Sequence, residues 1–179
     1  MKKMKVQSIL ACMTAVAVLM GGCGKEAATE ASAEAAVAEG NKEVEAVVEE
    51  IPAKPVQEIY EEIAQGVELH SPMPMADSFI SNYYGINPDK LEEYVFVMSE
   101  EATSAETVAI MKVKEEGDVE SIKAALQVLV DEKRGEMEDY LPDQFEIVDK
   151  SEVKTKGNYV YLVISEQADA ITKIIENGI

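Results

Sequence analysis

Apolar residues divide the chain into three stretches that differ in pattern. A mostly apolar run at residues 6–20 follows three lysines. Residues 24–53 are rich in alanine and glutamate and contain no aromatic residue. From residue 54 onward, apolar residues recur with helical and strand periods, which is typical of a folded domain. We therefore expect one domain at residues 54–179.

Helical spacing of apolar residues begins this domain. Residues 56–63 carry apolar side chains at positions i, i+3, i+4 and i+7, between Pro55 and Gly66. Proline favours the first turn of a helix and glycine favours its end, so a short amphipathic helix is predicted here. Residues 67–75 contain two prolines and break the pattern. A second short helix is predicted at residues 76–83.

Two more helices are predicted further along the chain. A long one follows Asp118, a plausible N-cap, and ends near Tyr140 before Pro142. Ser165 can cap the last helix, in which four apolar residues form one stripe. That stripe consists of Ala168, Ile171, Ile174 and Ile175.

Strands are predicted where β-branched and aromatic residues gather, at residues 94–98, 107–113, 145–153 and 159–164. The turn Lys156-Gly157-Asn158 separates the last two. The order helix, strand, strand, helix, strand, strand, helix predicts an α+β fold, with an antiparallel or mixed sheet of about four strands and helices packed on it.

Two of these strands, at residues 95–98 and 159–164, are apolar on both faces. Central strands that are covered by helices on both sides would have this composition. An apolar face left open for a partner would look the same. The sequence leaves both alternatives open.

The start of the chain has the pattern of an export signal. Its apolar run of 15 residues is too short and too polar to span a bilayer, which takes about 20 apolar residues. The run ends in Leu19-Met20-Gly21-Gly22-Cys23, which resembles the lipobox of bacterial lipoproteins. This resemblance implies that residues 1–22 are removed and that Cys23 receives a diacylglyceryl anchor at the extracytoplasmic face of the cell membrane.

Cys12 is the competing lipidation candidate, but it lies too close to the lysines to follow a full apolar run. Cleavage before Cys23 and acylation of that residue would leave a mature chain with no thiol and no disulfide. Residues 23–53 are then the lipidated cysteine and a spacer of roughly 30 Å as a coil or about 45 Å as a helix. The alternative interpretation of this segment is an acidic recognition tail, or an amphipathic valine-rich helix around Val44, Val47 and Val48.

Charge excludes one class of partner. The formal net charge is -19, and it becomes -22 once residues 1–22, with three lysines and no acidic residue, are removed. Such a surface repels phosphate backbones and anionic headgroups, so we expect no nucleic-acid binding and no flat adsorption to the membrane.

Candidate catalytic residues are few. His70 is the only histidine, and it falls in the proline-rich connector, where an ordinary polar role is expected. Ser151 and Lys154 match the Ser-x-x-Lys pattern of penicillin-binding proteins. That pattern acts on a helix, whereas a strand is predicted here, in which residues i and i+3 point to opposite faces. We expect no cofactor and no metal site.

Charged residues suggest only surface roles. The acidic loops could attract calcium, but the ligand spacing of an EF-hand is absent. Arg134 is the sole arginine, and an ion pair with Asp131 or Glu138 on the same helix is expected.

Several strand and turn segments resemble the family known as domain of unknown function 4358. They are residues 84–86, 105–114, 140–142 and 156–160, and the resemblance extends over about residues 73–175. The resemblance implies a lipoprotein of a Gram-positive anaerobe. It implies no activity, cofactor or binding site.

Three classes of function remain. The first is a membrane-anchored, non-enzymatic module that binds another cell-envelope component, such as a protein. The second is a small-solute or ion-binding lipoprotein, which would need a cavity with convergent polar groups. The third is a carboxylate-based envelope hydrolase, whose mark would be a close pair of buried acids in a cleft.

Overall fold

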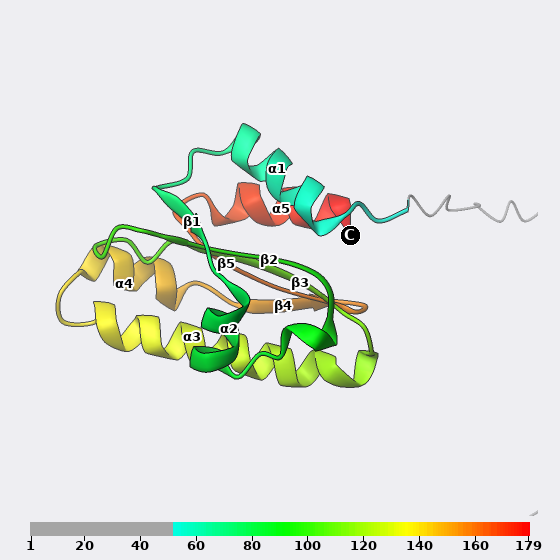
Figure 1. Cartoon of the computed structure of the whole chain (residues 1–179). Helices are drawn as coiled ribbons and strands as arrows, with labels where there is room; N and C mark the ends of the chain where they lie inside the picture. Colours follow the sequence, from blue (N-terminus) through cyan, green and yellow to red (C-terminus); the bar gives the residue numbers. More distant parts are fainter. Residues whose placement is uncertain (1–51) are drawn as a thin grey trace, which may run out of the picture. The chain divides into compact units, whose positions relative to one another are not determined.

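The computed structural model describes residues 52–179. This part of the chain has three layers, in which a five-stranded sheet lies between two layers of helices (Figure 1). The predicted signal peptide, Cys23 and nearly all of the predicted spacer lie outside the described residues. Within residues 52–179, no helix is long and apolar enough to cross a membrane.

All neighbouring strands in the sheet are antiparallel, and their order is β1-β2-β3-β5-β4. β3 and β5 form the centre, with Ile110 opposite Tyr161. The glycine of the predicted turn, Gly157, has a positive φ of 56° and joins β4 to β5. The antiparallel α+β fold is therefore confirmed. The strands are β1 (Pro72–Pro74), β2 (Leu91–Ser99), β3 (Thr107–Val113), β4 (Val153–Lys156) and β5 (Tyr159–Ile164).

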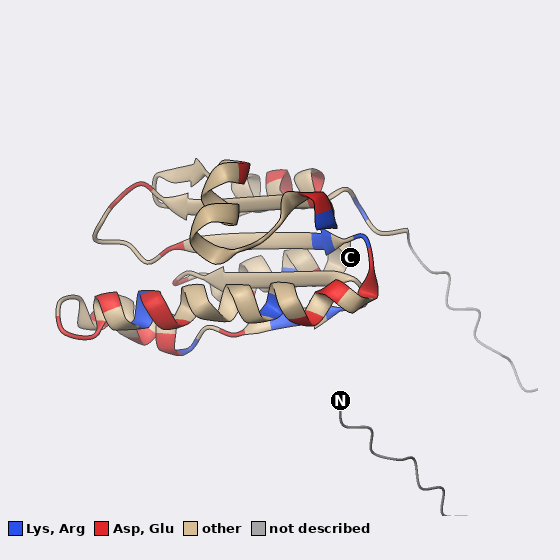
Figure 2. Cartoon of the chain, turned by 60° about the horizontal axis from the view of Figure 1, so that its bottom comes forward, with Lys and Arg blue, Asp and Glu red and all other residues tan. Residues whose placement is uncertain are grey.

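Helices cover both faces of this sheet. One layer contains α1 and α5, and the other contains α2, α3 and α4 (Figure 1). Figure 2 shows acidic residues spread over helices and loops, while the strands are largely uncharged. The helices are α1 (Val56–Gly66), α2 (Asp77–Tyr84), α3 (Val119–Met137), α4 (Pro142–Asp149) and α5 (Ala168–Gly178), with 3-10 turns at Pro88–Lys90 and Glu116–Asp118.

The two helix layers bury separate apolar clusters against the sheet. On the α3 side, β5 contributes Leu162, with Phe96 from β2 and Leu126 from α3. On the α1–α5 side, Ile59 and Ile171 pack on the opposite face of the same strands. The strands that are apolar on both faces are thus covered on both sides. An open sheet face for a partner, the other alternative from the sequence, is not present among the described strands.

The strand predicted at residues 145–153 is wrong. Its first part is the helix α4, and only Val153 belongs to a strand, β4. Pro142 lies in the first turn of α4, where its fixed φ and missing N–H cost nothing. Phe145 and Val148 then fall on one helical face and join the apolar cluster under α3. The spacing of apolar residues within residues 145–153 is compatible with both the strand period and the helical period.

Three further local predictions need correction. A fifth strand, β1, forms in the proline-rich break, which is possible because an edge strand tolerates proline. Asp118 lies at the N-cap position of α3, as predicted, but its side chain makes no capping hydrogen bond and instead accepts one of 2.7 Å from Lys90. Ser165 is not the N-cap residue of α5, which is Gln167. The Oγ of Ser165 nevertheless accepts a 3.2 Å hydrogen bond from the N–H of Gln167, while its hydroxyl donates to Glu106.

Candidate ligand-binding groove

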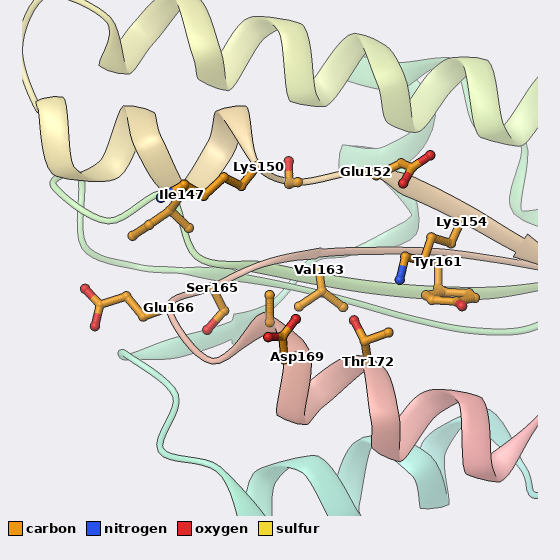
Figure 3. Close-up of a pocket in the computed structure, with 12 residues that line it drawn as sticks. Ile147, Lys150, Glu152, Lys154, Tyr161, Val163, Ser165, Glu166, Asp169 and Thr172 are labelled. Carbon is orange, nitrogen blue, oxygen red and sulfur yellow. The ribbon is translucent and has the colours of Figure 1, made fainter.

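A groove of about 410 Å³ lies between α5 and the edge strand β4. Its walls are the connector from α4 to β4, the strands β4 and β5, and the first turns of α5 (Figure 3). This volume falls within the range of roughly 300–1,000 Å³ that is typical of small-molecule sites.

The position of β4 at the sheet edge explains why the groove forms. Val153 points toward α3 and is only 3% exposed, whereas the next residue, Lys154, faces the α5 side because side chains alternate along a strand. Lys154 is paired with Tyr161 of β5. On the α5 side, β4 therefore presents lysine stems, and the space beside α5 is not filled by an apolar side chain.

Apolar side chains from two elements make the floor of the groove. Val163 and Tyr161 come from β5, and Ala168 comes from the first turn of α5. The Tyr161 hydroxyl donates a 3.0 Å hydrogen bond to Oε1 of Glu176. Burial raises the pKa of Tyr161 to about 12, and the hydrogen bond to Glu176 and its charge add to the effect. This phenol is therefore a fixed, neutral part of the floor.

Charged groups of both signs line the walls. Lys154 of β4 lies across the groove from Asp169 and Thr172 of α5, and the three side chains are directed toward the intervening space (Figure 3). Lys154 contacts Glu176 at 3.7 Å, a long ion pair with both partners partly exposed. Within residues 52–179, neither Asp169 nor Thr172 has a side-chain hydrogen bond or ion pair in the structure.

The Ser-x-x-Lys pair is present in the groove but lacks the arrangement of a nucleophile and its base. Ser151 lies in the connector before β4, not in a strand as predicted, and its hydroxyl donates a 2.6 Å hydrogen bond to the carbonyl of Val148. Lys154 lies in β4 and pairs with Glu176. Both residues line the groove, but no hydrogen bond joins them.

A buried carboxylate that the sequence did not reveal lies at one end of the sheet, just before β3. Glu106 is 9% exposed. Its Oε1 accepts a 2.7 Å hydrogen bond from the Ser165 hydroxyl, and its Oε2 accepts one from the backbone N–H of His70. Burial raises the pKa of nearby Tyr60, and the charge of Glu106 raises it further. Glu106 thus joins the α1–β1 connector to the end of β5.

His70 and Ser165 therefore meet at Glu106, but not as a catalytic triad. The Ser165 hydroxyl donates to the carboxylate directly, and the contact of His70 is through its backbone. Among residues 52–179, Glu106 is the only buried acidic residue, so the described part lacks the close pair of buried acids that would mark a carboxylate hydrolase. The same residues contain no group of three His, Cys, Asp or Glu positioned for a metal ion.

Arg134 makes the ion pair predicted on its own helix and a second pair with another helix. Its guanidinium lies 3.2 Å from Asp131 on α3, which confirms the prediction of a pair with Asp131 or Glu138, and it also pairs with Asp149 at 3.1 Å. Since Asp149 ends α4, Arg134 links the two helices outside their apolar contact.

A model of the family described as a domain of unknown function (DUF4358) matches residues 65–165, more than half of the chain. The chain therefore belongs to this family, as the resemblance indicated. The matched region contains the β4 and β5 walls of the groove and ends at Ser165, before α5. No curated protein and no solved structure matches the chain.

Proposed function

We propose that the protein is a lipid-anchored, extracytoplasmic module that binds another component of the cell envelope and has no enzymatic activity. The groove between α5 and β4 is its binding surface. The observation that carries this proposal is the groove itself, which combines an apolar floor with charged side chains on facing walls. Such a mixture suits recognition of a polar ligand.

The anchor in this proposal is the diacylglyceryl group on Cys23, because that cysteine follows an apolar run and two glycines. Two acyl chains hold a protein stably at a membrane, whereas one chain binds only marginally. The spacer then separates the domain from the lipid. The expected location is the extracytoplasmic face of the cell membrane.

The helices on both faces of the sheet restrict where a partner can bind. Because helices pack on both faces, the apolar strands are not available as a docking surface. The groove at the sheet edge remains open to solvent, and a segment of an envelope protein could enter it beside β4. A small solute is the second candidate occupant, and the volume of about 410 Å³ favours it.

Site-specific photocrosslinking in intact cells tests this function. The crosslinking amino acid replaces Ser151 in the groove, and a control replaces the exposed Glu120 on α3. We expect one envelope component to be captured from position 151, and its capture to be lost when Lys154→Glu is added. Equal capture from both positions, or no capture from position 151, would overturn the proposal.

Fractionation of the same cells tests the anchor. Cys23→Ser should release the protein from the membrane fraction or leave unprocessed precursor, because no acyl chain can be attached. Cys12→Ser is the matched control and should leave membrane retention unchanged. Normal lipid labelling of the Cys23→Ser variant would contradict the assignment.

A further inference from the structure

We propose that the ligand of this groove is a short peptide with free ends, whose ammonium lies at Asp169 and whose carboxylate lies at Lys154. This inference rests on the proposed function and specifies the chemistry of the bound component. It follows from the placement of charge on opposite walls, from the available volume and from the apolar floor.

Opposite charges face each other across the groove. Asp169 on α5 and Lys154 on β4 are both directed into the space above Val163 (Figure 3). They form no ion pair with each other. A ligand that carries one positive and one negative end can therefore satisfy both side chains at once. A ligand with a single charge would leave one wall facing a like charge.

The existing partners of Lys154 do not prevent this arrangement. Its contact with Glu176 is 3.7 Å long, and the two side chains are 43% and 48% exposed. Exposed ion pairs of this kind contribute little, typically below about 1 kcal/mol. Lys154 can thus turn from Glu176 to a ligand carboxylate at small cost. Asp169 has no hydrogen bond or ion pair to give up within residues 52–179.

Three other lining residues match the body of a small peptide, although Lys150, Glu152 and Glu166 also line the groove. Thr172 lies one turn after Asp169 on α5, and its hydroxyl is available to a peptide amide or carbonyl. Val163 and Ala168 supply an apolar surface for a short aliphatic side chain. Two extended residues span about 7 Å, so a dipeptide is a suitable first probe for a groove of this volume.

Calorimetric titration of the full chain in detergent with dialanine tests the inference. N-acetyl-dialanine and dialanine amide serve as ligands that lack one charged end. We expect saturable binding of dialanine and about tenfold weaker binding of either blocked form. Asp169→Asn and Lys154→Gln should each weaken dialanine binding by about tenfold, since each removes one charged contact.

The blocked peptides also identify which end each side chain contacts. Asp169→Asn should not weaken N-acetyl-dialanine further, because its ammonium is already absent, and Lys154→Gln should likewise not weaken dialanine amide further. Asp143→Asn, in the first turn of α4, and Lys173→Gln, on the exposed part of α5, are matched controls outside the groove and should bind dialanine as the unmodified chain does.

Three results would overturn the inference: no binding of dialanine, equal binding of the blocked peptides, or binding unaffected by both groove variants. The proposed function is judged separately, by capture from position 151 in cells. Capture without dialanine binding would reject the peptide chemistry and leave the groove as the binding surface. Absence of both would reject both proposals.

Discussion

The helix layers on the two faces of the sheet cover the edge strand β4 to different extents. On the α3 side, α3 packs on both β5 and β4, and Val153 is buried in the apolar cluster. On the other side, α5 packs on β5, while β4 presents Lys154 and Lys156. One layer thus seals the edge and the other leaves a groove beside it. A sheet with helices on both faces can therefore still have a site at its edge, where one helix layer is narrower than the sheet.

The narrower layer is also held by polar contacts. The Tyr161 hydroxyl bonds to Glu176 of α5, and the Lys156 ammonium donates to backbone carbonyls at the carboxyl end of that helix. At the other end, Ser165 bonds to Glu106. These contacts fix α5 at its two ends without filling the space between α5 and β4. We therefore expect stability on this side to depend on hydrogen bonds more than on packing at the groove.

The largest effect is expected at Glu106. Glu106→Ala should lower the free energy of unfolding of the full chain by about 2–4 kcal/mol, because the buried Ser165 hydroxyl and the N–H of His70 lose their acceptor. Denaturant titration measures the change. Glu166→Ala, an exposed residue nearby, should stay within about 0.5 kcal/mol of the unmodified chain. Equal effects of the two substitutions would contradict a structural role for the buried carboxylate.

Substitutions of two valines of β5 allow packing on the two faces of the sheet to be compared directly. Val160 is fully buried on the α3 side, and Val163 is 6% exposed at the groove. Val160→Ala should lower the free energy of unfolding by about 2–3 kcal/mol, because it leaves a closed cavity. Val163→Ala should lower it by about 1 kcal/mol, because the groove is already open. Thermal and denaturant unfolding of both variants tests this. Val163 also belongs to the buried cluster on the α1–α5 side, so a cost equal to that of Val160→Ala would show that its packing there outweighs its contact with the groove.

The sequence predicted the parts of this fold that depend on local pattern. The bounds of β3 and β5 agree with the predicted strands at residues 107–113 and 159–164, because long runs of β-branched residues leave little alternative. α4 was missed because apolar alternation over a short segment fits a strand as well as a helix. β1 depends on pairing with β2, which no local pattern in a proline-rich segment reveals.

The groove could not be predicted, because it depends on tertiary placement. Lys154 comes from β4, whereas Asp169 and Thr172 come from α5, and only the edge position of β4 brings the two walls together. Ser151 and Lys154 match a catalytic sequence pattern but form no catalytic pair, and both line the groove. Glu106 is one of 35 acidic residues, and nothing in the sequence marks it as the buried one.

The smallest expected effect concerns pH and the tie between β5 and α5. The pKa of Tyr161 is raised to about 12, mainly by burial and then by Glu176, from the value near 10 of an unfolded tyrosine. The stabilisation linked to the neutral phenol is therefore fully present below about pH 10 and is lost as the pH rises through about 12. Between these values the unfolded state releases its proton first, so the free energy of unfolding falls with pH.

Ionisation of the Tyr161 phenol accounts for part of the decrease in the free energy of unfolding at alkaline pH. Tyr161→Phe should remove that part, so the free energy of unfolding of this variant should fall less between pH 10 and 12 than that of the unmodified chain. Glu176→Gln should remove only part of that share, because burial is the larger cause of the raised pKa. Denaturant titrations at several pH values measure how steeply the free energy of unfolding falls with pH.

Tyr84 and Tyr94, whose pKa values are also raised to about 12, contribute to this fall in every variant. An unchanged slope in Tyr161→Phe would show that the contact between β5 and α5 opens before the phenol ionises, and the narrower helix layer would then be the first part of the domain to separate from the sheet.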